Sequence, residues 1–442
     1  MAQVTDSEPV ALALRPSDSE RDERHVGRVK SMRTMLSVEE AQKVVLDRVG
    51  QLSATPTAVT TAALGSVLAE DVVADIDSPP FDKSLVDGYA VRSSDCSSGD
   101  ARLQVVGEVV AGQKEATGIL PGQALRVMTG AAIPEGADAV VMHEDCESVG
   151  PHIRVRRPVQ PGCNIFRRGQ EIQRGQKVLL SGHVLTPAAM AVLATVGRIH
   201  VLTIRQPVVA IVSTGDELVE PAMTPGSGQI RNSNGTYLTM AVARAGGLPR
   251  YLGIARDRSD SLHPLLMQGL QADVLLVSGG VSAGRLDLVP DALRLLGVHI
   301  HFHKLALKPG KPLLFGTHGQ TAVFGLPGNP VSTLAGFHLL VRPALRKLMG
   351  KKPVLPLKIA VPAIHSLHIR TDRPTYHPAR LMRHDSSWQV QLLPWQGSPD
   401  LRTMTEANCF ALIPPGEHQI QPGQILSVFP LEDDLAAYEP CP

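Results

Sequence analysis

The chain has 442 residues, which is too long for one ordinary hydrophobic core, so several domains are expected. Hydrophobic residues make up 43% and charged residues 19%, as is typical of soluble globular proteins. The 43 basic residues balance the 42 acidic ones, and aromatic residues reach only 3%, which argues against nucleic acid and anionic membranes as partners.

Cysteine usage and the N-terminal stretch indicate where the protein works. The 5 cysteines lie far apart without a C-x-x-C pair, which favours a reducing compartment over a disulfide scaffold or a structural zinc site. The first 35 residues are polar and charged, so they predict no signal peptide. No apolar run is long enough to cross a bilayer. We therefore expect a cytoplasmic protein without a membrane partner.

Residues 1–35 carry few large apolar side chains, so we expect a disordered extension there. Deleting them should leave the fold and the activity unchanged, because a segment that buries little apolar surface adds little to a core. Size-exclusion chromatography and an activity assay of the truncated chain check this prediction. Loss of the soluble oligomer after truncation would refute it.

A helix is expected to begin after Ser37, which can cap it and is followed by acidic residues in the first turn. A second helix is expected over 187–197. The two helical stretches predict one elongated mixed domain, made of residues 36–77 and 166–202. The Val- and Gly-rich chain between them has frequent turns, which predicts a β-rich inserted domain over 78–165.

Three segments of this first part could bind a ligand. Residues 78–92 combine paired prolines, an Asp-Gly step and charges, as in a shaped loop or an ordinary hairpin. Thr129 stands beside a glycine and could bind an oxyanion or cap a turn. Arg167 and Arg168 suit a polyanion because guanidinium groups match phosphate geometry, or they lie on a solvated basic turn.

Residues 207–350 alternate short apolar runs with helical patterns, which predicts a doubly wound α/β domain. Such sheets bind ligands at the carboxyl ends of their strands, and here these ends carry small, polar or acidic residues. The expected strands are 208–212, 251–255, 273–277 and 321–326, and the expected helices are 232–245, 259–270, 288–296 and 330–349.

The loop Ser278-Gly279-Gly280-Val281-Ser282 follows one expected strand, and its glycines let backbone N–H groups approach a phosphate or another oxyanion. It is neither a G-x-G-x-x-G fingerprint nor a P-loop, so no dinucleotide or nucleoside-triphosphatase site is predicted. Carboxylates at the same edge of the sheet would hold a divalent cation, typically Mg²⁺, although each one alone could instead cap a helix. These carboxylates are Asp216, Glu217, Asp257 and Asp287.

Two further loops predict anion binding. Lys304, Lys308 and Lys311 surround a Pro-Gly turn that forbids one continuous helix, so the lysines should converge on an oxyanion. The turn from Pro327 to Pro330 precedes a helix and should leave backbone N–H groups free for a second anion pocket. Together the loops predict a site for a phosphorylated ligand, a metal and a second oxyanion.

After residue 350, prolines and short β-type runs predict a small C-terminal β domain. The expected fold class is therefore a multidomain α/β protein with a central doubly wound α/β domain. The expected boundaries are 1–35 for the extension, 36–77 with 166–202 for the elongated mixed domain, 78–165 for the β-rich insertion, 203–350 for the α/β domain and 351–437 for the C-terminal β domain.

These residues resemble the molybdopterin molybdenumtransferase family, also called the MoeA or gephyrin E-domain type, over residues 36–437. The resemblance is specific because six motifs stand in the family's order, whereas any one of them would be weak. The motifs lie at 81–92, 128–131, 213–218, 278–282, 304–312 and 325–332.

The resemblance implies a transferase of molybdenum cofactor biosynthesis. Such an enzyme inserts molybdate into adenylylated molybdopterin and releases AMP, assisted by a divalent cation such as Mg²⁺. The resemblance also implies an elongated homodimer, with the β domain of one chain facing the α/β site of the other. Further partners that it implies are a molybdopterin adenylyltransferase and molybdoenzyme apoproteins or their chaperones.

The resemblance also assigns roles to single residues. Asp87 would help to position the metal-assisted hydrolysis of the pyrophosphate, and Thr129 would contact the substrate. The metal would be held by Glu217, Asp257 and Asp287, with Glu217 also catalytic. Lys304 and Lys308 would receive molybdate or phosphate as catalytic residues, and the expected substrate-binding residues are Ser278, Gly279, Gly280, Ser282, Pro327, Pro330, Arg167 and Arg168.

Two positions depart from the family pattern. Phe166 replaces the arginine of an Asn-Ile-Arg motif, and Arg285 stands where many members have an acidic or small polar residue.

Two other functions explain the sequence less well. The related adenylyltransferase resembles only residues 207–350, which leaves the flanking motifs unexplained. A non-catalytic molybdopterin-binding scaffold or carrier would not need the carboxylates and lysines that this chain has.

Overall fold

The structure is a computed structural model, and it describes residues 35–113, 118–282, 288–384 and 387–432. Residues 1–34 of the expected extension 1–35 and the predicted metal ligand Asp287 lie outside these residues. The chain divides into two compact units, which are described separately below. The first unit contains Val208–Leu345 and Val354–Pro442 together with the chain up to Val49, and the second contains Gly50–Pro207 and Arg346–Pro353.

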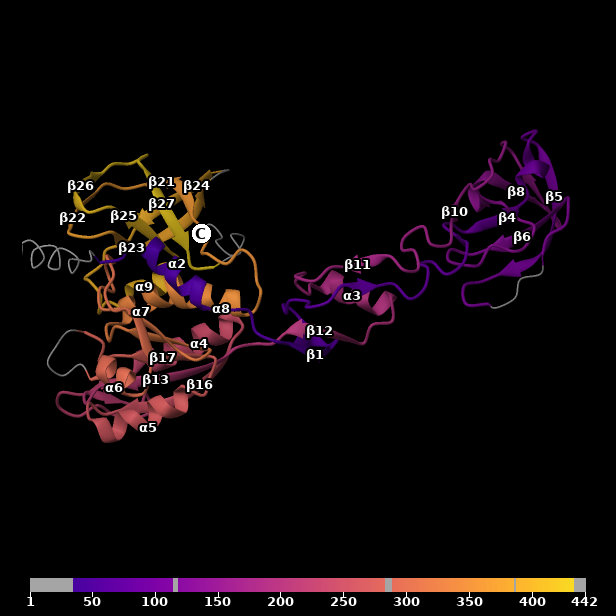
Figure 1. Cartoon of the computed structure of the whole chain (residues 1–442). Helices are drawn as coiled ribbons and strands as arrows, with labels where there is room; N and C mark the ends of the chain where they lie inside the picture. The colour runs from indigo at the N-terminus through magenta and orange to yellow at the C-terminus, as the bar shows by residue number, and fades with distance from the viewer. Residues whose placement is uncertain (1–34, 114–117, 283–287, 385–386, 433–442) are drawn as a thin grey trace, which may run out of the picture. The chain divides into compact units, whose positions relative to one another are not determined.

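A six-stranded sheet in the order β16-β13-β17-β20-β19-β18 forms the centre of the first unit (Figure 1). The four strands expected from the sequence pair in parallel, which confirms the α/β fold class. Two further strands extend the sheet in antiparallel pairing and were not expected. The strands are β13 Val208–Thr214, β16 Leu248–Ala255, β17 Val274–Ser278, β18 His299–Phe302, β19 Leu314–His318 and β20 Thr321–Leu326, with the short pair β14 Leu218–Val219 and β15 Ile230–Arg231 beside them.

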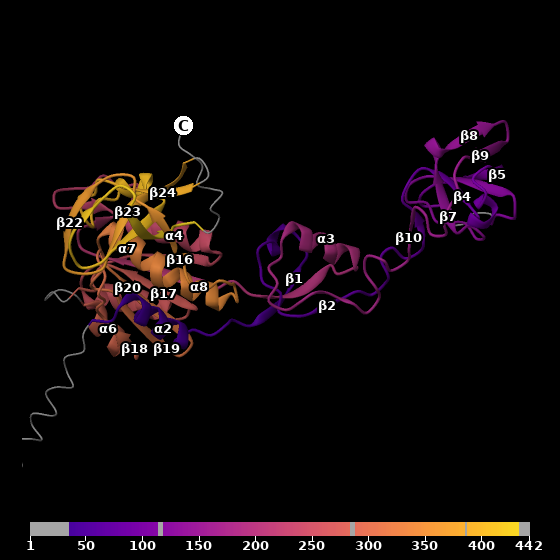
Figure 2. The same ribbon diagram turned by 90° about the horizontal axis from the view of Figure 1, so that it is seen from above.

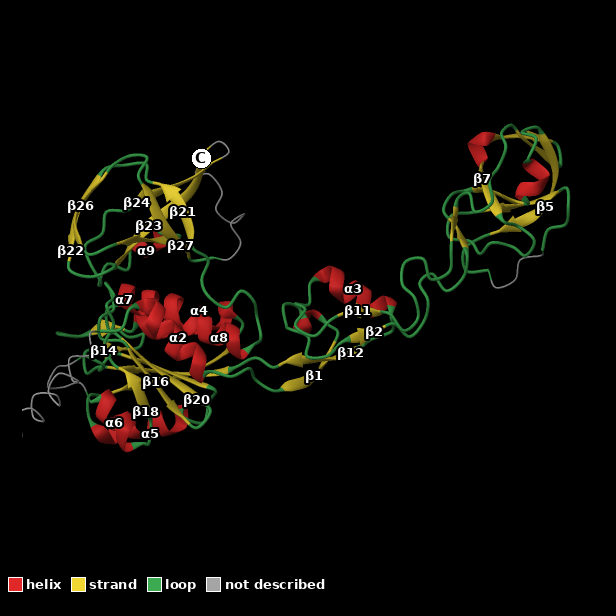
Figure 3. Cartoon of the chain, turned by 45° about the horizontal axis from the view of Figure 1, so that its top comes forward, coloured by secondary structure: helices red, strands yellow, loops and turns green. Residues whose placement is uncertain are grey.

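Helices cover both faces of this sheet. Figures 1 and 3 show α5 and α6 on one face, and α4 and α7 on the other. The core between α5, α6 and the sheet is built from buried aliphatic side chains such as Leu262, Leu275 and Leu293. The helices are α4 Ser233–Ala245, α5 Ser259–Gly269, α6 Val289–Leu295, α7 Pro330–Gly336, the π-helical turn η4 Phe337–Val341 and α8 Arg342–Leu348.

The first helix, α2 Val38–Arg48, begins as expected at Ser37, whose side chain forms a capping box with Glu40. Its domain assignment differs from the expectation, because the helix belongs to the first unit rather than with residues 166–202. The side chain of Gln42 donates a hydrogen bond of 2.9 Å to the Leu339 carbonyl of η4. The apolar face of α2 is buried. Helical periodicity predicts that this face is buried, but it does not specify which domain the helix packs against.

The C-terminal β domain also belongs to the first unit and contains a five-stranded antiparallel sheet in the order β21-β27-β25-β23-β24. A separate two-stranded sheet, β22-β26, lies beside it. The elements are β21 Ile359–Pro362, β22 Leu367–Thr371, β23 Thr375–His384, β24 Ser387–Leu392, α9 Thr403–Glu406, β25 Cys409–Ile413, β26 Gly416–Ile420 and β27 Ile425–Pro430.

The second unit contains a six-stranded sheet in the order β7-β4-β6-β5-β9-β8, and the smaller pairs β1-β12, β11-β2 and β10-β3 (Figure 2). Helix α3 packs on a separate core that includes Leu68, Leu185 and Leu193. The remaining domain boundaries stay predictions. The elements are β1 Ala54–Ala58, η1 Thr61–Ala63, β2 Val72–Val73, β3 Lys83–Ser84, β4 Gly88–Val91, η2 Ser93–Cys96, β5 Ala101–Val109, β6 Gln123–Val127, β7 Ala139–Met142, η3 His143–Asp145, β8 Cys146–Val149, β9 His152–Val155, β10 Ile165–Phe166, β11 Lys177–Leu179, α3 Pro187–Thr195 and β12 His200–Ile204.

Candidate functional site

A pocket of about 570 Å³ lies in the first unit where β13, β17 and β20 end, and we call it the sheet-edge pocket. Its place agrees with the rule that open α/β sheets bind ligands at the carboxyl ends of their strands. Several predicted site residues meet there although they are far apart in the sequence. Its lining includes Thr214, Glu217, Asn234, Asp257, Ser278, Gly279, Gly280, Ser282, Pro327, Asn329 and Pro330.

The glycine turn after β17 is held tightly. Gly279 has a φ of +96° and Gly280 a φ of +61°, a left-handed backbone that favours glycine. The Gly279 N–H donates to the Leu326 carbonyl at 3.0 Å, so this amide is not available to an anion. A Cβ at Gly279 would lie 2.4 Å from the carbonyl oxygen of Thr214. The turn therefore requires glycine both for its dihedral angles and for its close approach to β13.

Replacing Gly279 with alanine is expected to destabilise this turn by about 1–3 kcal/mol, because alanine adds backbone strain and the turn must move away from Thr214. Differential scanning calorimetry measures the loss. Gly253→Ala is the matched control, since Gly253 has a φ of +107° but a Cβ added there would meet no atom within 4 Å. Equal losses in the two variants would contradict the argument from close approach.

Ser278, predicted to bind substrate, is buried and already engaged. Its Oγ accepts a hydrogen bond of 2.9 Å from Asn234 Nδ2, and the same nitrogen donates at 2.8 Å to the Gly328 carbonyl. Asn234 was not expected at the site, since in sequence it is only a polar residue near the start of a helix. It ties the glycine turn to the turn that begins at Pro327, so the two loops form one wall.

The sheet-edge pocket contains two of the expected metal ligands, Glu217 and Asp257. The neighbouring carboxylate of Asp216 accepts a hydrogen bond of 3.1 Å at Oδ1 from the Asp257 N–H. Within the described residues, no three His, Cys, Asp or Glu side chains are grouped closely enough to hold a metal by themselves. Two carboxylates nevertheless fit Mg²⁺, which is usually bound by one or two carboxylates together with water and substrate phosphates.

A second pocket of about 560 Å³ adjoins the first, and we call it the lysine pocket. The two pockets share Pro312, Pro327 and Asn329, so a ligand group in one lies next to the other. Lys308 and Lys311 line the lysine pocket, as the converging-lysine argument predicted. The lining also includes Leu307, Pro309, Gly310, Ser332, Leu367, His368, Ile369, Arg373, Thr375, His377, Leu393, Pro394, Trp395, Gly397 and Ser398.

Two details near the lysine pocket differ from the expectation. Lys304 is exposed and lines neither pocket. Pro330 begins α7 as predicted, but the N–H of Val331 is not free, because it donates to the Ser398 carbonyl at 3.0 Å. Sequence reasoning missed this partner because it comes from the C-terminal β domain.

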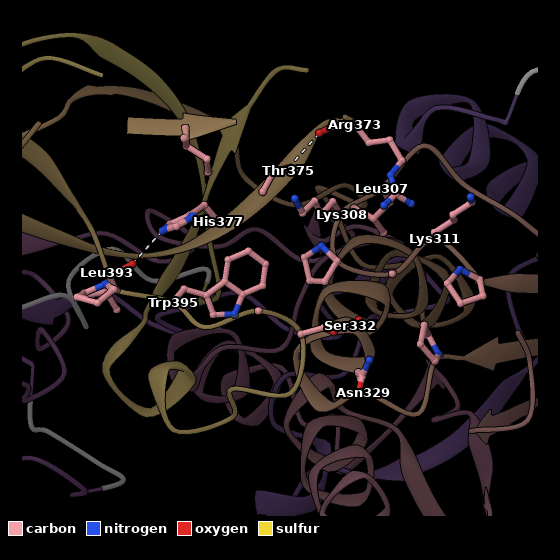
Figure 4. A pocket seen from close by; sticks show the side chains of 18 of the residues that line it. Leu307, Lys308, Lys311, Asn329, Ser332, Arg373, Thr375, His377, Leu393 and Trp395 are labelled. Atoms are coloured by element: carbon pink, nitrogen blue, oxygen red, sulfur yellow. Dashed lines mark hydrogen bonds between the residues drawn. The ribbon is translucent and has the colours of Figure 1, made fainter. Parts of the chain in front are cut away.

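The C-terminal β domain adds polar side chains to the lysine pocket that the sequence did not single out, among them Arg373, His377 and Trp395 (Figure 4). Arg373 Nη1 and Trp395 Nε1 are buried donors without a hydrogen-bond partner among the described residues. His377 packs edge-on against Trp395, with ring centroids 5.4 Å apart, and its Nε2–H donates to the Leu393 carbonyl. Buried donors without partners are costly, so this end of the pocket is suited to an oxyanion.

Burial lowers the pKa of the His377 imidazole below its usual range, against an opposing hydrogen bond to Leu393. The folded state therefore keeps His377 neutral, while the unfolded state takes up a proton near pH 6.5. Stability should consequently fall as the pH drops from about 7.5 to about 5.5. Melting temperatures across this range measure the effect, and His377→Gln, which keeps a donor for Leu393, should reduce it. The same pH dependence in both proteins would contradict the assignment.

In the second unit, Asp87 and Thr129 lie together because β4 and β6 pair side by side. The Thr129 N–H and hydroxyl both donate to Asp87 Oδ1, at 2.7 and 2.8 Å. These two bonds lower the pKa of the exposed Asp87 carboxyl, and the bond from the Thr129 backbone is the larger cause. The positive charge of Arg126 lowers this pKa further. Asp87 is therefore an exposed carboxylate that is ionised at neutral pH, with its Oδ1 fixed by Thr129.

The two predicted substrate arginines have intramolecular partners. Arg167 pairs with Asp82 and Arg168 with Asp77, each at 2.6 Å. Both ion pairs belong to the second unit, so Arg167 and Arg168 join the segments around β3 and β10. Phe166, the departure from the family pattern, lies under the Lys83 ammonium at 5.4 Å from the ring centroid, which suits a cation–π contact.

Family models match three successive parts of the chain. The MoeA N-terminal region, domains I and II, matches residues 36–197; a probable molybdopterin-binding domain matches 210–347; and the MoeA C-terminal region, domain IV, matches 361–431. A molybdopterin molybdenumtransferase from Staphylococcus aureus strain MRSA252 is 33% identical over 408 residues, which are 90% of this chain and 97% of the relative. The chain belongs to the molybdopterin molybdenumtransferase (MoeA) family.

Other members of the family agree. The Bacillus subtilis molybdopterin molybdenumtransferase is 32% identical over 383 residues, covering 84% of this chain and 89% of the relative. Two solved structures of the molybdopterin biosynthesis MoeA protein from Pyrococcus horikoshii have TM-scores of 0.78 and 0.74, with 31% and 29% identity. They cover 91% and 90% of this chain and all of their own chains. Among the described residues, no helix has the length and apolar character needed to cross a membrane.

Proposed function

We propose that the chain inserts molybdate into adenylylated molybdopterin and releases AMP, as a transferase of molybdenum cofactor biosynthesis. The observation that carries this proposal is the pair of adjoining pockets in the first unit. One offers carboxylates beside a glycine turn, and the other offers cations and buried donors. Their common wall would place a phosphorylated ligand next to an oxyanion, which are the two substrates of this reaction.

In the sheet-edge pocket, we propose that Glu217 and Asp257 hold Mg²⁺, together with Asp287, which lies outside the described residues. Bound Mg²⁺ would neutralise negative charge that develops on the pyrophosphate as AMP departs. Gly280 and Ser282 line the same pocket and would contact the phosphate-bearing part of the ligand. Ser278 and Gly279 would contribute by shaping this wall, since both already have internal hydrogen bonds.

In the lysine pocket, we propose that Lys308 binds molybdate together with Lys311 and Arg373. Three cations give this pocket a positive potential that attracts a tetrahedral dianion, and the guanidinium can donate two parallel hydrogen bonds to it. The wall at Pro327 would limit the position of molybdate, whereas Pro330 lines the sheet-edge pocket and would contact the phosphorylated ligand there. Lys304 would attract the anion from the exposed surface instead of contacting it inside the pocket, in keeping with its exposure.

We further propose that Asp87 and Thr129 take part in the hydrolysis of the pyrophosphate. Arg167 and Arg168 would contact the substrate while they remain paired with Asp82 and Asp77.

A homodimer in the cytoplasm is proposed from the family resemblance, with a molybdopterin adenylyltransferase and molybdoenzyme apoproteins or their chaperones as further partners. Light scattering coupled to size-exclusion chromatography tests the dimer. A monomer at micromolar concentration would contradict it.

The decisive experiment is a turnover assay with purified protein, adenylylated molybdopterin, molybdate and Mg²⁺, following AMP release and formation of active cofactor. AMP release that needs both molybdate and the divalent cation is the expected result. Tight binding of the adenylylated substrate without AMP release, with any divalent cation, would overturn the proposal and favour a non-catalytic carrier. The site carboxylates argue against that alternative, because a carrier does not need them.

A further inference from the structure

The loop that carries Glu217 into the sheet-edge pocket is held from behind by one guanidinium group. Arg256, at the carboxyl end of β16, donates from Nη1 to the carbonyl oxygens of Asp216 at 2.9 Å and Leu218 at 3.1 Å, with a longer contact to Gly215 at 3.4 Å. Arg256 is half-buried and does not line the pocket. It therefore acts on the loop's backbone and is not placed to bind the ligand.

Further contacts complete the restraint of this loop. The Asp257 N–H donates to Asp216 Oδ1 at 3.1 Å, and the Ile230 N–H donates to the Glu217 carbonyl at 2.8 Å. The Glu217 carboxylate folds back over Gly215, where an added Cβ would lie only 2.5 Å from Oε2. The position of the Glu217 carboxylate thus depends on a backbone turn whose carbonyl groups point at Arg256.

Arginine is well suited to this task. Its guanidinium is rigid, planar and always charged, so it attracts several carbonyl dipoles at once and keeps them in one arrangement. A lysine ammonium on a flexible stem would retain the charge but not the fixed geometry. Without either group, the loop carbonyls would turn to water, and the loop would sample other conformations. Glu217 and Asp257 would then spend less time in the spacing that a shared cation requires.

We infer that Arg256 is a positioning residue for the cation site, which it supports by holding the Gly215–Leu218 backbone so that Glu217 and Asp257 face one ligand. This inference rests on the proposed function, because it takes these two carboxylates as cation ligands. It concerns the geometry of the free protein, so it can be measured without turnover.

The test measures binding of Mn²⁺, a paramagnetic substitute for Mg²⁺, in the presence of AMP by electron paramagnetic resonance. The variants are Arg256→Met and Arg256→Lys on the full chain. The matched control is Arg250→Met, because Arg250 is an exposed arginine of β16, the strand that Arg256 directly follows. We expect the dissociation constant for Mn²⁺ to rise about ten-fold or more in Arg256→Met, the size usual for groups that orient metal ligands, and less in Arg256→Lys. The control should match the unmodified protein.

Hydrogen exchange provides the second measurement, since it reports the loop directly. The Ile230 amide, which donates to Glu217, should exchange faster in Arg256→Met, while amides in the core strand β17 keep their protection. Unchanged Mn²⁺ binding and unchanged exchange at Ile230 in a folded Arg256→Met would overturn the inference. If Glu217→Gln binds Mn²⁺ as well as the unmodified protein, the proposed cation site fails instead, and the exchange result still decides whether Arg256 holds the loop.

Discussion

Replacing Asp87 with alanine is expected to lower the rate of AMP release by about 10²-fold or more, the contribution usual for a group acting directly on the reacting atoms. The structure supplies the reason. Two hydrogen bonds from Thr129 lower the pKa of the Asp87 carboxyl and fix its Oδ1, so the exposed side chain presents an ionised, oriented carboxylate. Single-turnover kinetics with the adenylylated substrate, molybdate and Mg²⁺ measure the effect.

Two comparisons separate a catalytic effect of Asp87 from a structural one. Asp100→Ala is the matched control, because Asp100 is another exposed aspartate of the same unit with a low carboxyl pKa, caused by its hydrogen bond with Arg154. It should leave the rate unchanged. Thr129→Val removes the hydroxyl donor, keeps the backbone donor and should cause a smaller loss than Asp87→Ala. Full activity of Asp87→Ala, with its fold intact, would exclude Asp87 from the reaction.

The second large effect is expected in the lysine pocket. Lys308→Met and Arg373→Met should each raise the KM for molybdate by about 10–100-fold, because each removes a charged donor from a partly dehydrated anion site. The affinity for adenylylated molybdopterin should change far less, since this ligand is proposed to bind mainly in the sheet-edge pocket. Initial rates of AMP release at varied molybdate measure the KM.

Lysine variants elsewhere show whether the effect depends on the pocket. Lys43→Met, on the exposed side of α2, is the matched control and should leave the KM for molybdate unchanged. Lys304→Met tests the weaker role proposed for an exposed lysine, and it should raise the KM less than Lys308→Met does. A Lys308→Met protein with an unchanged KM for molybdate would contradict the placement of this anion.

Features that depend on residues close in the chain could be predicted from the sequence. Strand β17 and the glycines that follow it were predictable, because an apolar β-branched run and a Gly-Gly turn express preferences of neighbouring residues. The cap at Ser37 was also predictable, since a capping residue directly precedes its helix, and the structure adds that Glu40 completes a capping box. Antiparallel strands β18 and β19 were missed because their short runs carry mixed histidines and glycines.

The candidate site divides in the same way. Glu217, Asp257 and Lys308 stand at strand ends or turns, so the chain's order of elements was enough to suggest that they belong to one site. The order of elements could not predict the other residues that complete the site. Asn234 reaches a loop 44 residues away, and Arg373 and Trp395 come from a different domain. Their sequence surroundings have no feature that distinguishes them from ordinary polar or apolar positions.

The sequence by itself determined the central α/β domain, its ligand-binding edge, the family and the residue types available for the chemistry. The domain and its edge follow from the periodicity of apolar residues and from turn preferences, which act between residues close in the chain, and the family follows from the resemblance of six ordered motifs. Only the tertiary structure decided that α2 packs on η4, that Arg167 and Arg168 are engaged in ion pairs, and that the two pockets share a wall. These features depend on which surfaces pack against each other with the most favourable free energy. That free energy is a property of the whole packed unit and not of any short segment.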